Sequence, residues 1–303
     1  MAQLRKMCKA KRWRFAHQIT ITDVESFLVD LREKKGRNIT TSNHYLRAIK
    51  RFVRWLKRSR KIPEDTLDGV SLLNPATDRR HDRRSLMVEE FARLYHVAHN
   101  GPPSIGLSGP DRAMLYMFAA WTGLRRGEIG SLRLRSFDFQ AKPPTVTVAA
   151  AYSKHRREDV CYLHSELVDA LSAWLEWLQP DPDDILFPVS EATCGIDRRT
   201  SIMIKRDLEI ARAIWISEAD SEEERQKRET SDFLKYVNSQ GRYADFHALR
   251  HTFVTNLARA NVDPKTAQTL ARHSDIRLTM DIYTHVDKKQ QVDAIDSLPS
   301  LIQ

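Results

Sequence analysis

The sequence predicts a mainly α-helical protein of two domains that carries one small antiparallel β-sheet. A chain of 303 residues with 41% hydrophobic residues is long enough to bury a core in each of two domains. Most segments with a regular apolar pattern repeat every three or four positions, which is typical of amphipathic helices. One pair of short segments rich in β-branched residues favours strands instead.

Positive charge is concentrated in the N-terminal part of the chain. Residues 1–84 contain 22 Lys and Arg against 9 Asp and Glu, whereas residues 85–303 contain 27 against 31. A compact segment with such an excess attracts a polyanion and releases condensed counterions when it binds one. This split predicts a nucleic-acid partner, and a basic face that only increases solubility is the alternative.

Residues 1–78 are expected to form the first domain, a small helical one. Apolar periodicity predicts helices at Thr22–Leu31, with Thr22 or Asp23 as cap, and at Thr41–Arg60. A row of arginines follows one side of the second helix, which suits either a phosphate backbone or a solvated face: Arg47, Arg51, Arg54 and Arg58. Residues 79–84, which are almost all charged, are expected to be a basic linker.

The second domain is expected to span residues 85–303. The segment Pro110–Trp121 is apolar on nearly every side, which predicts a central buried helix. Thr145–Ala149 and Asp159–Leu163 alternate as strands do and flank a basic turn, so they predict a β-hairpin with a cationic tip. A further amphipathic helix is predicted from Ser165 to Leu178.

Some classes of protein are disfavoured by composition. No apolar stretch reaches the roughly 18 residues of a membrane span, and the first residues lack the apolar segment of a signal peptide. We therefore expect a cytoplasmic protein without a membrane partner. The three cysteines are widely spaced, so they suggest neither a disulfide framework nor a zinc site.

The first motif with chemical potential is Thr122-Gly-Leu-Arg-Arg-Gly-Glu-Ile129, directly after the buried helix. Gly123 can turn the chain there, so that Arg125 leaves the core at a rigid position. A guanidinium matches two phosphate oxygens and always stays charged, which suits the stabilisation of phosphoryl transfer. Glu128 lies one helical turn later and is expected to support Arg125, although a purely structural Arg–Glu pair would have the same sequence.

The second motif is His247-Ala-Leu-Arg-His251, on a helix predicted from Phe246 to Ala260 with Asp245 as its cap. His247 and Arg250 are three residues apart, so an imidazole and a guanidinium can reach the same phosphate. Ordinary surface residues at this spacing are the alternative. His251 is turned about 100° away and is expected to give packing or support.

The third motif contains His273 and, ten residues later, Tyr283, one of eight tyrosines in the chain. Its sequence, His273-Ser-Asp-Ile-Arg-Leu-Thr-Met-Asp-Ile-Tyr-Thr-His285, resembles the C-terminal signature of the tyrosine recombinase, or phage integrase, family. The two upstream arginine motifs occur in that family's order. Residues 43–56 also resemble its N-terminal helical domain.

The resemblance implies a fold and an activity. It implies a helical core-binding (SAM-like) domain and a mainly α catalytic domain with a small antiparallel sheet, which close around double-stranded DNA as a C-shaped clamp. It also implies site-specific cutting and rejoining of DNA through a 3′-phosphotyrosine. A homotetramer would act on DNA, with a monomer free in solution.

The resemblance also assigns roles to single residues. Tyr283 would be the nucleophile, Arg125, Arg250 and His273 would stabilise the phosphate, and His247 would assist proton transfer. Lys154 at the hairpin tip would protonate the leaving oxygen, and its neighbours Arg156 and Arg157 are expected to contact the DNA backbone. No metal or other cofactor is implied, because the cationic side chains supply the stabilisation.

One departure from the family pattern and two alternatives remain. Residues 213–242 look like an inserted segment with a solvated helix, in which Glu223–Lys227 and Glu224–Arg228 pairs are expected.

One alternative to a recombinase is a type IB topoisomerase-like enzyme, which would use similar chemistry to relax DNA. A non-catalytic DNA-binding protein of the same fold is the alternative from another class.

Overall fold

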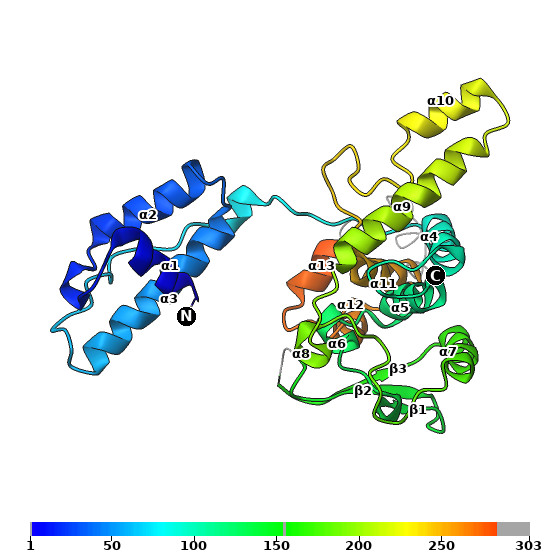
Figure 1. Cartoon of the computed structure of the whole chain (residues 1–303), viewed down its shortest axis with the longest axis horizontal. Coiled ribbons are helices and arrows are strands. Elements are labelled where there is room, and N and C mark those ends of the chain that lie inside the picture. Colours follow the sequence, from blue (N-terminus) through cyan, green and yellow to red (C-terminus); the bar gives the residue numbers. More distant parts are fainter. Residues whose placement is uncertain (1, 154–155, 284–303) are drawn as a thin grey trace, which may run out of the picture. The chain divides into compact units, whose positions relative to one another are not determined.

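The computed structural model describes residues 2–153 and 156–283, and the chain divides into two compact units, Met1–Asp82 and Arg83–Gln303 (Figure 1). Lys154 and His155 therefore lie outside the described residues. In the described part of the chain, no helix has both the length and the apolar character needed to cross a membrane.

The first unit is a small helical domain in which α3 packs against both α1 and α2. Its helices are α1 (Ala2–Lys11), α2 (Ile21–Glu33) and α3 (Ile39–Arg58), with short 3-10 turns at Ala16–Gln18 and Pro75–Asp78. The two predicted helices are confirmed, but each begins earlier than expected. Thr20 and Asn38 accept hydrogen bonds from the first turns and act as the caps, so the predicted cap at Thr22 or Asp23 was wrong.

The helix α1 was not predicted. Its apolar residues Leu4 and Met7 are buried in the core of the first unit, although most of the helix is polar. Two buried positions in ten residues form too narrow a stripe for a periodic pattern. Packing against α3, rather than the local sequence, therefore stabilises this helix.

The second unit is built around the helix α5 (Gly109–Thr122), which contacts α4, α7 and α11. The prediction of a central buried helix is confirmed, because Tyr116 and Phe118 are fully buried. The other helices of this unit, with a 3-10 turn at Leu134–Ser136, are α4 (Val88–Asn100), α6 (Arg126–Ile129), α7 (Ser165–Leu178), α8 (Glu191–Cys194), α9 (Thr200–Ser217), α10 (Glu222–Thr230), α11 (Ala248–Arg259), α12 (Pro264–Leu270) and α13 (Arg277–Tyr283).

The β-sheet of the second unit has three antiparallel strands in the order β1-β2-β3. The strands are β1 (Phe137–Asp138), β2 (Thr145–Val148) and β3 (Asp159–Tyr162). The predicted hairpin is confirmed, with Val146 paired to Cys161. Because β1 has only two residues, it is too short to show the alternation that predicts a strand.

The segment 213–242 is partly as expected. The helix α10 carries the two predicted ion pairs, Lys227 to Glu223 at 3.1 Å and Arg228 to Glu224 at 2.5 Å. Residues 213–217, however, belong to α9, and the Arg228 guanidinium lies 5.2 Å from the Trp215 ring. Figure 1 shows α10 beside the end of α9 that is remote from the sheet.

The last two residues of the expected linker are anchored in the second unit. Arg84 donates two hydrogen bonds of 2.8 Å to Glu90, whose carboxylate is buried and also accepts from the Leu234 amide. Arg83 donates to both oxygens of Asp245 at 2.9 and 3.0 Å. These contacts fix the beginning of the second unit next to α11.

Candidate active site

The chain turns sharply where α5 ends, and this turn places Arg125. Gly123 has a φ of 59°, and a Cβ atom there would lie 2.4 Å from the ring of Phe253. Both the backbone conformation and the space therefore require glycine. The turn brings Arg125 to the N-terminal end of the short helix α6.

Glu128 holds Arg125 by both its backbone and its side chain. The Arg125 amide donates to Glu128 Oε2 at 2.9 Å, and Nη1 donates to Oε1 at 2.8 Å. The Glu128 side chain is only 3% exposed, whereas that of Arg125 is 24% exposed. The carboxylate therefore fixes a guanidinium that solvent or a ligand can still reach.

Arg250 lies in the same cluster and is buried in the first turns of α11. Its guanidinium donates to the carbonyl oxygens of Gly123 and Ala271, so it joins the Arg125 turn to the segment that precedes His273. Burial and the charges of Arg125 and Arg272 lower the pKa of Arg250 to about 9. It therefore keeps its positive charge at neutral pH.

Two predicted site histidines are uncharged at neutral pH. Burial and the neighbouring charges of Arg250 and Arg125 lower the pKa of His273 to about 4. Burial, Arg83 and His251 lower the pKa of His247 to about 3. A neutral imidazole has one nitrogen that accepts a proton, so both rings can take part in proton transfer.

His273 and His247 each have a neighbour that orients the ring. The Nδ1 atom of His273 lies 2.9 Å from the hydroxyl oxygen of Thr279, which is fully buried on α13. The ring of His251 stands edge-on to that of His247, with 5.8 Å between centroids. His251, which was expected to give packing or support, thus lies next to His247.

The hydroxyl of Tyr283 has a different partner from the arginine cluster. It donates a hydrogen bond of 2.8 Å to the carbonyl oxygen of Val262, and burial and the charge of Asp263 raise its pKa. The structure thus brings Arg125, Arg250 and His273 together and holds the Tyr283 hydroxyl on the loop between α11 and α12. The attack by this oxygen that the resemblance implies would require that the bond to Val262 be broken.

Residues near the hairpin tip are described only in part. Lys154, the expected leaving-group acid, lies outside the described residues. Arg156 and Arg157 are exposed, and Arg157 Nε donates to the buried Asp159 at 3.3 Å. Their assignment to the DNA backbone stays a prediction.

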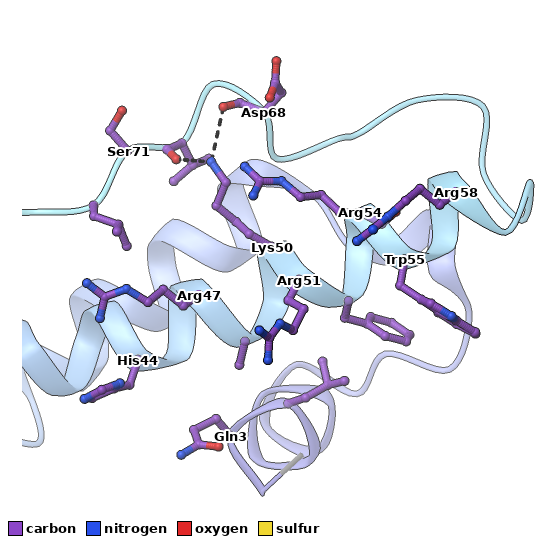
Figure 2. A pocket seen from close by; sticks show the side chains of 15 residues that line it. Gln3, His44, Arg47, Lys50, Arg51, Arg54, Trp55, Arg58, Asp68 and Ser71 are labelled. Atoms are coloured by element: carbon purple, nitrogen blue, oxygen red, sulfur yellow. Dashed lines mark hydrogen bonds between the residues drawn. The ribbon is translucent and has the colours of Figure 1, made fainter. Parts of the chain in front are cut away.

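A basic groove in the first unit contains all four arginines of the predicted row. Figure 2 shows Arg47, Arg51, Arg54 and Arg58 along α3, with Gln3 of α1 nearby. Lys50 lines the same groove and donates to the carbonyl oxygens of Asp68 and Val70. Arg54 forms an ion pair with Asp65, with 3.6 Å between Nε and Oδ2. Five cations along one groove form a candidate surface for a phosphate backbone.

The start of α11 differs from the predicted helix. The helix was expected from Phe246 to Ala260 with Asp245 as its cap, but it begins at Ala248 and His247 occupies the cap position. Asp245 still accepts a hydrogen bond from the Ala248 amide at 3.0 Å while it binds Arg83. This long-range pair with Arg83 has no signal in the local sequence.

Three residues near the site were not predicted as functional: Arg83, Arg272 and Thr279. Arg272 immediately precedes His273, and Thr279 follows it by six residues. Thr279 lies within the C-terminal signature, which could have identified it, whereas Arg272 lies outside the three motifs. In the described part of the chain, no group of three or more His, Cys, Asp or Glu side chains is arranged to hold a metal ion.

Fold and site together define a class of protein. A small helical unit, and a mainly helical unit that carries a small antiparallel sheet, are what the resemblance to tyrosine recombinases implied. A model described as the phage integrase family matches residues 84–290, well over half of the chain. The chain belongs to this family, so the prediction is confirmed.

Curated relatives span nearly the whole chain. Tyrosine recombinase XerC of Natranaerobius thermophilus is 25% identical over 278 residues, which cover 91% of this chain and 81% of the relative. Tyrosine recombinase XerC of Escherichia coli O1:K1 is 28% identical over 285 residues, covering 92% and 80%. The similarity thus includes the first unit as well as the second.

Solved structures of similar fold include protein–DNA complexes. The XerH site-specific recombinase bound to palindromic difH substrate matches with a TM-score of 0.61 at 17% identity, over 97% of this chain and 77% of that one. A lambda integrase dimer bound to a COC′ core site matches with a TM-score of 0.62 at 15% identity, over 95% and 89%. At these identities the likeness confirms the predicted fold class.

Proposed function

We propose that this protein is a site-specific DNA recombinase that cuts and rejoins strands through a covalent bond between DNA and Tyr283. The observation that carries the proposal is the cluster of Arg125, Arg250 and His273, in which the buried Glu128 holds Arg125, in a chain of this family. The class itself, an enzyme of DNA strand breakage and rejoining, follows from family membership.

The arginine cluster suits the charge that develops during the reaction. Arg125 and Arg250 carry fixed positive charges, and Glu128 holds Arg125 in one orientation. Such preorganised donors stabilise negative charge that appears on phosphate oxygens in the transition state. The neutral ring of His273, held by Thr279, would add a hydrogen bond to the same phosphate.

In the proposed cleavage step, the Tyr283 oxygen attacks the scissile phosphorus. A phosphorus–oxygen bond to tyrosine forms while the bond to the 5′ oxygen breaks, so the DNA keeps a 3′-phosphotyrosine and releases a 5′-hydroxyl. The tyrosine proton would pass to His247, and Lys154 would protonate the leaving oxygen. The reverse attack by a 5′-hydroxyl of a partner strand rejoins the DNA without an external energy source.

Before cleavage, Tyr283 must leave Val262. A hydrogen bond of this kind contributes about 1 kcal/mol net, which is small beside the barrier of phosphoryl transfer. A bound phosphate also adds negative charge near the histidines, which raises the pKa of His247 and makes it a better proton acceptor. Substrate binding would therefore prepare both the nucleophile and its base.

DNA is the proposed substrate, which is why we also propose a cytoplasmic site of action. The basic groove of α3 and the exposed Arg156 and Arg157 would bind the backbone of double-stranded DNA. Recombination joins two duplexes that are each cut twice, so we propose a homotetramer on DNA that forms from monomers. Each protomer would close around its DNA as a C-shaped clamp.

The test is the capture of a covalent adduct. Purified protein is incubated with nicked genomic fragments, adducts are isolated in denaturant, and the enriched sequence is rebuilt as a substrate with a nick beside the cleavage site. The wild type should form an adduct at a peptide that contains Tyr283, and Tyr283→Phe should form none. Tyr162→Phe, which removes the hydroxyl of an exposed tyrosine on β3, is the matched control and should react normally.

The remaining alternatives give different outcomes. If the wild type forms no adduct with any of the genomic fragments, a non-catalytic DNA-binding protein is left. An adduct with Tyr283→Phe would show that another residue is the nucleophile. Exchange of strands between two substrate copies would establish recombination, whereas relaxation of supercoiled DNA without exchange would establish a topoisomerase-like enzyme.

A further inference from the structure

Arg272 combines two unfavourable features in one residue. Its φ is 53°, in the left-handed region that favours glycine, and the residue is only 7% exposed. An L-residue in this region is strained, and burial of a guanidinium removes it from water. Strain of this kind persists where surrounding contacts enforce it, and it is concentrated at functional sites.

The contacts of Arg272 join three parts of the second unit. Its Nη1 donates to the Cys161 sulfur at 2.6 Å, and its Nη2 lies 3.8 Å from Glu128 Oε2. Cys161 belongs to β3, which leads away from the hairpin tip, and Glu128 belongs to α6. Through its backbone, Arg272 also adjoins His273. One side chain therefore connects the hairpin, the Arg125 turn and the histidine.

Several positive charges lie near Glu128. Arg125 is 2.8 Å from this carboxylate and Arg272 is 3.8 Å away, and the charge of Glu128 also acts on the buried Arg250. Three guanidinium groups thus act on one carboxylate. Positive charge gathered at this place suits a phosphodiester, which has one negative charge and gains more in the transition state.

We propose that Arg272 is a positioning residue of the phosphate site. It holds Glu128, and through it Arg125, relative to strand β3, and its charge lies behind the phosphate that Arg125 and Arg250 bind. The effect on cleavage rests on the proposed function. The effect on anion binding does not, so the two are measured separately.

The main test compares Arg272→Lys with Arg272→Met, two side chains of similar length that differ in charge. In single-turnover reactions with saturating protein, Arg272→Met should slow adduct formation on the order of tenfold or more, and Arg272→Lys should retain most of the rate. A purely structural role would lower the melting temperature of both variants and leave their rates per folded molecule equal. Equal rates, or a wild-type rate for Arg272→Met, would overturn the proposal.

Inorganic phosphate gives a readout without DNA cleavage. Phosphate should raise the melting temperature of the full-length wild type more than that of Arg272→Met, because the variant's site has lost one charge. Equal shifts would overturn the proposal, whether or not the wild type cleaves DNA. If the wild type shows the larger shift but forms no adduct, the proposed function fails and the role of Arg272 in anion binding stands.

The backbone strain supplies a matched control. Arg60 also has a left-handed φ, 55°, but it is exposed at the end of α3. Arg60→Gly and Arg272→Gly relieve the same strain, yet only Arg272→Gly should lose the response to phosphate.

A second variant serves if Arg272→Met does not fold. Cys161→Ala removes only the sulfur that accepts from Arg272, and it should still slow adduct formation. A wild-type rate for Cys161→Ala would overturn the proposal.

Discussion

Glu128→Gln is the substitution whose consequence can be worked out furthest. The carboxylate is buried, binds the backbone and side chain of Arg125, and lies 3.8 Å from Arg272. Glutamine keeps the shape and removes the charge, which leaves neighbouring guanidinium groups without their shared counter-charge. Removing one partner of a buried ion pair destabilises a protein by about 3–5 kcal/mol.

This loss corresponds to a measurable change in melting temperature. For a folded unit of about this size, 1 kcal/mol shifts the midpoint by roughly 2–4 °C, so Glu128→Gln should melt about 6–20 °C below the wild type. Glu89→Gln removes an exposed carboxylate on α4 and should change the midpoint little. Thermal unfolding followed by circular dichroism measures both.

Added phosphate should then restore part of the lost stability. An anion that binds the folded state at a hundred times its dissociation constant stabilises by about 2.7 kcal/mol, and the variant has the greater excess of positive charge. Phosphate should therefore raise the midpoint of Glu128→Gln more than that of the wild type or Glu89→Gln. A variant that melts like the wild type, or equal phosphate shifts in all three proteins, would refute the reasoning.

Three further outcomes are expected. Thr279→Val removes the hydroxyl beside His273 and should slow adduct formation by about 10–100-fold. Its effect on DNA affinity, measured by gel-shift titration of the variant and the wild type, should be smaller. Arg51→Ala should weaken DNA binding equally for different sequences and reduce the slope of log affinity against log salt concentration by about 1. An unchanged slope would show that the charge of Arg51 faces only solvent. Because His273 titrates near 4 in the folded state and near 6.5 when unfolded, the unfolded chain binds the extra proton and stability should fall as pH drops through this window. His273→Gln should show a shallower fall in melting temperature over the same range, and an equal fall would contradict the assigned pKa.

Local patterns predicted much of the fold because helices and strands repeat within a few residues. The buried helix α5 is apolar on nearly every side, and the alternation in β2 and β3 is clear, so both were predicted from the sequence. The helix α1 and the strand β1 were not predicted, because they form only through packing against other segments. The cap of α2 was misplaced because Thr20, which caps it, precedes the first buried residue, Val24, by several residues.

The candidate site divides in the same way. Arg125 and Glu128, three residues apart, make the contact that one helical turn predicts, and the His247 and Arg250 motif was recognisable from its spacing. By itself the sequence therefore determined the family, the chemical groups and their order. It contained no sign of the bond between Arg272 and Cys161, which are far apart in the chain.

Only the tertiary structure decided which charges share Glu128 and which group holds Tyr283. These contacts depend on how β3, α6 and the segment between α11 and α13 pack together, and packing is set by the shape of the whole core rather than by neighbours in sequence. The tyrosine was evident from the motif, whereas its bond to Val262 was not. The physical reason is that a hydroxyl takes whichever acceptor the folded backbone presents to it.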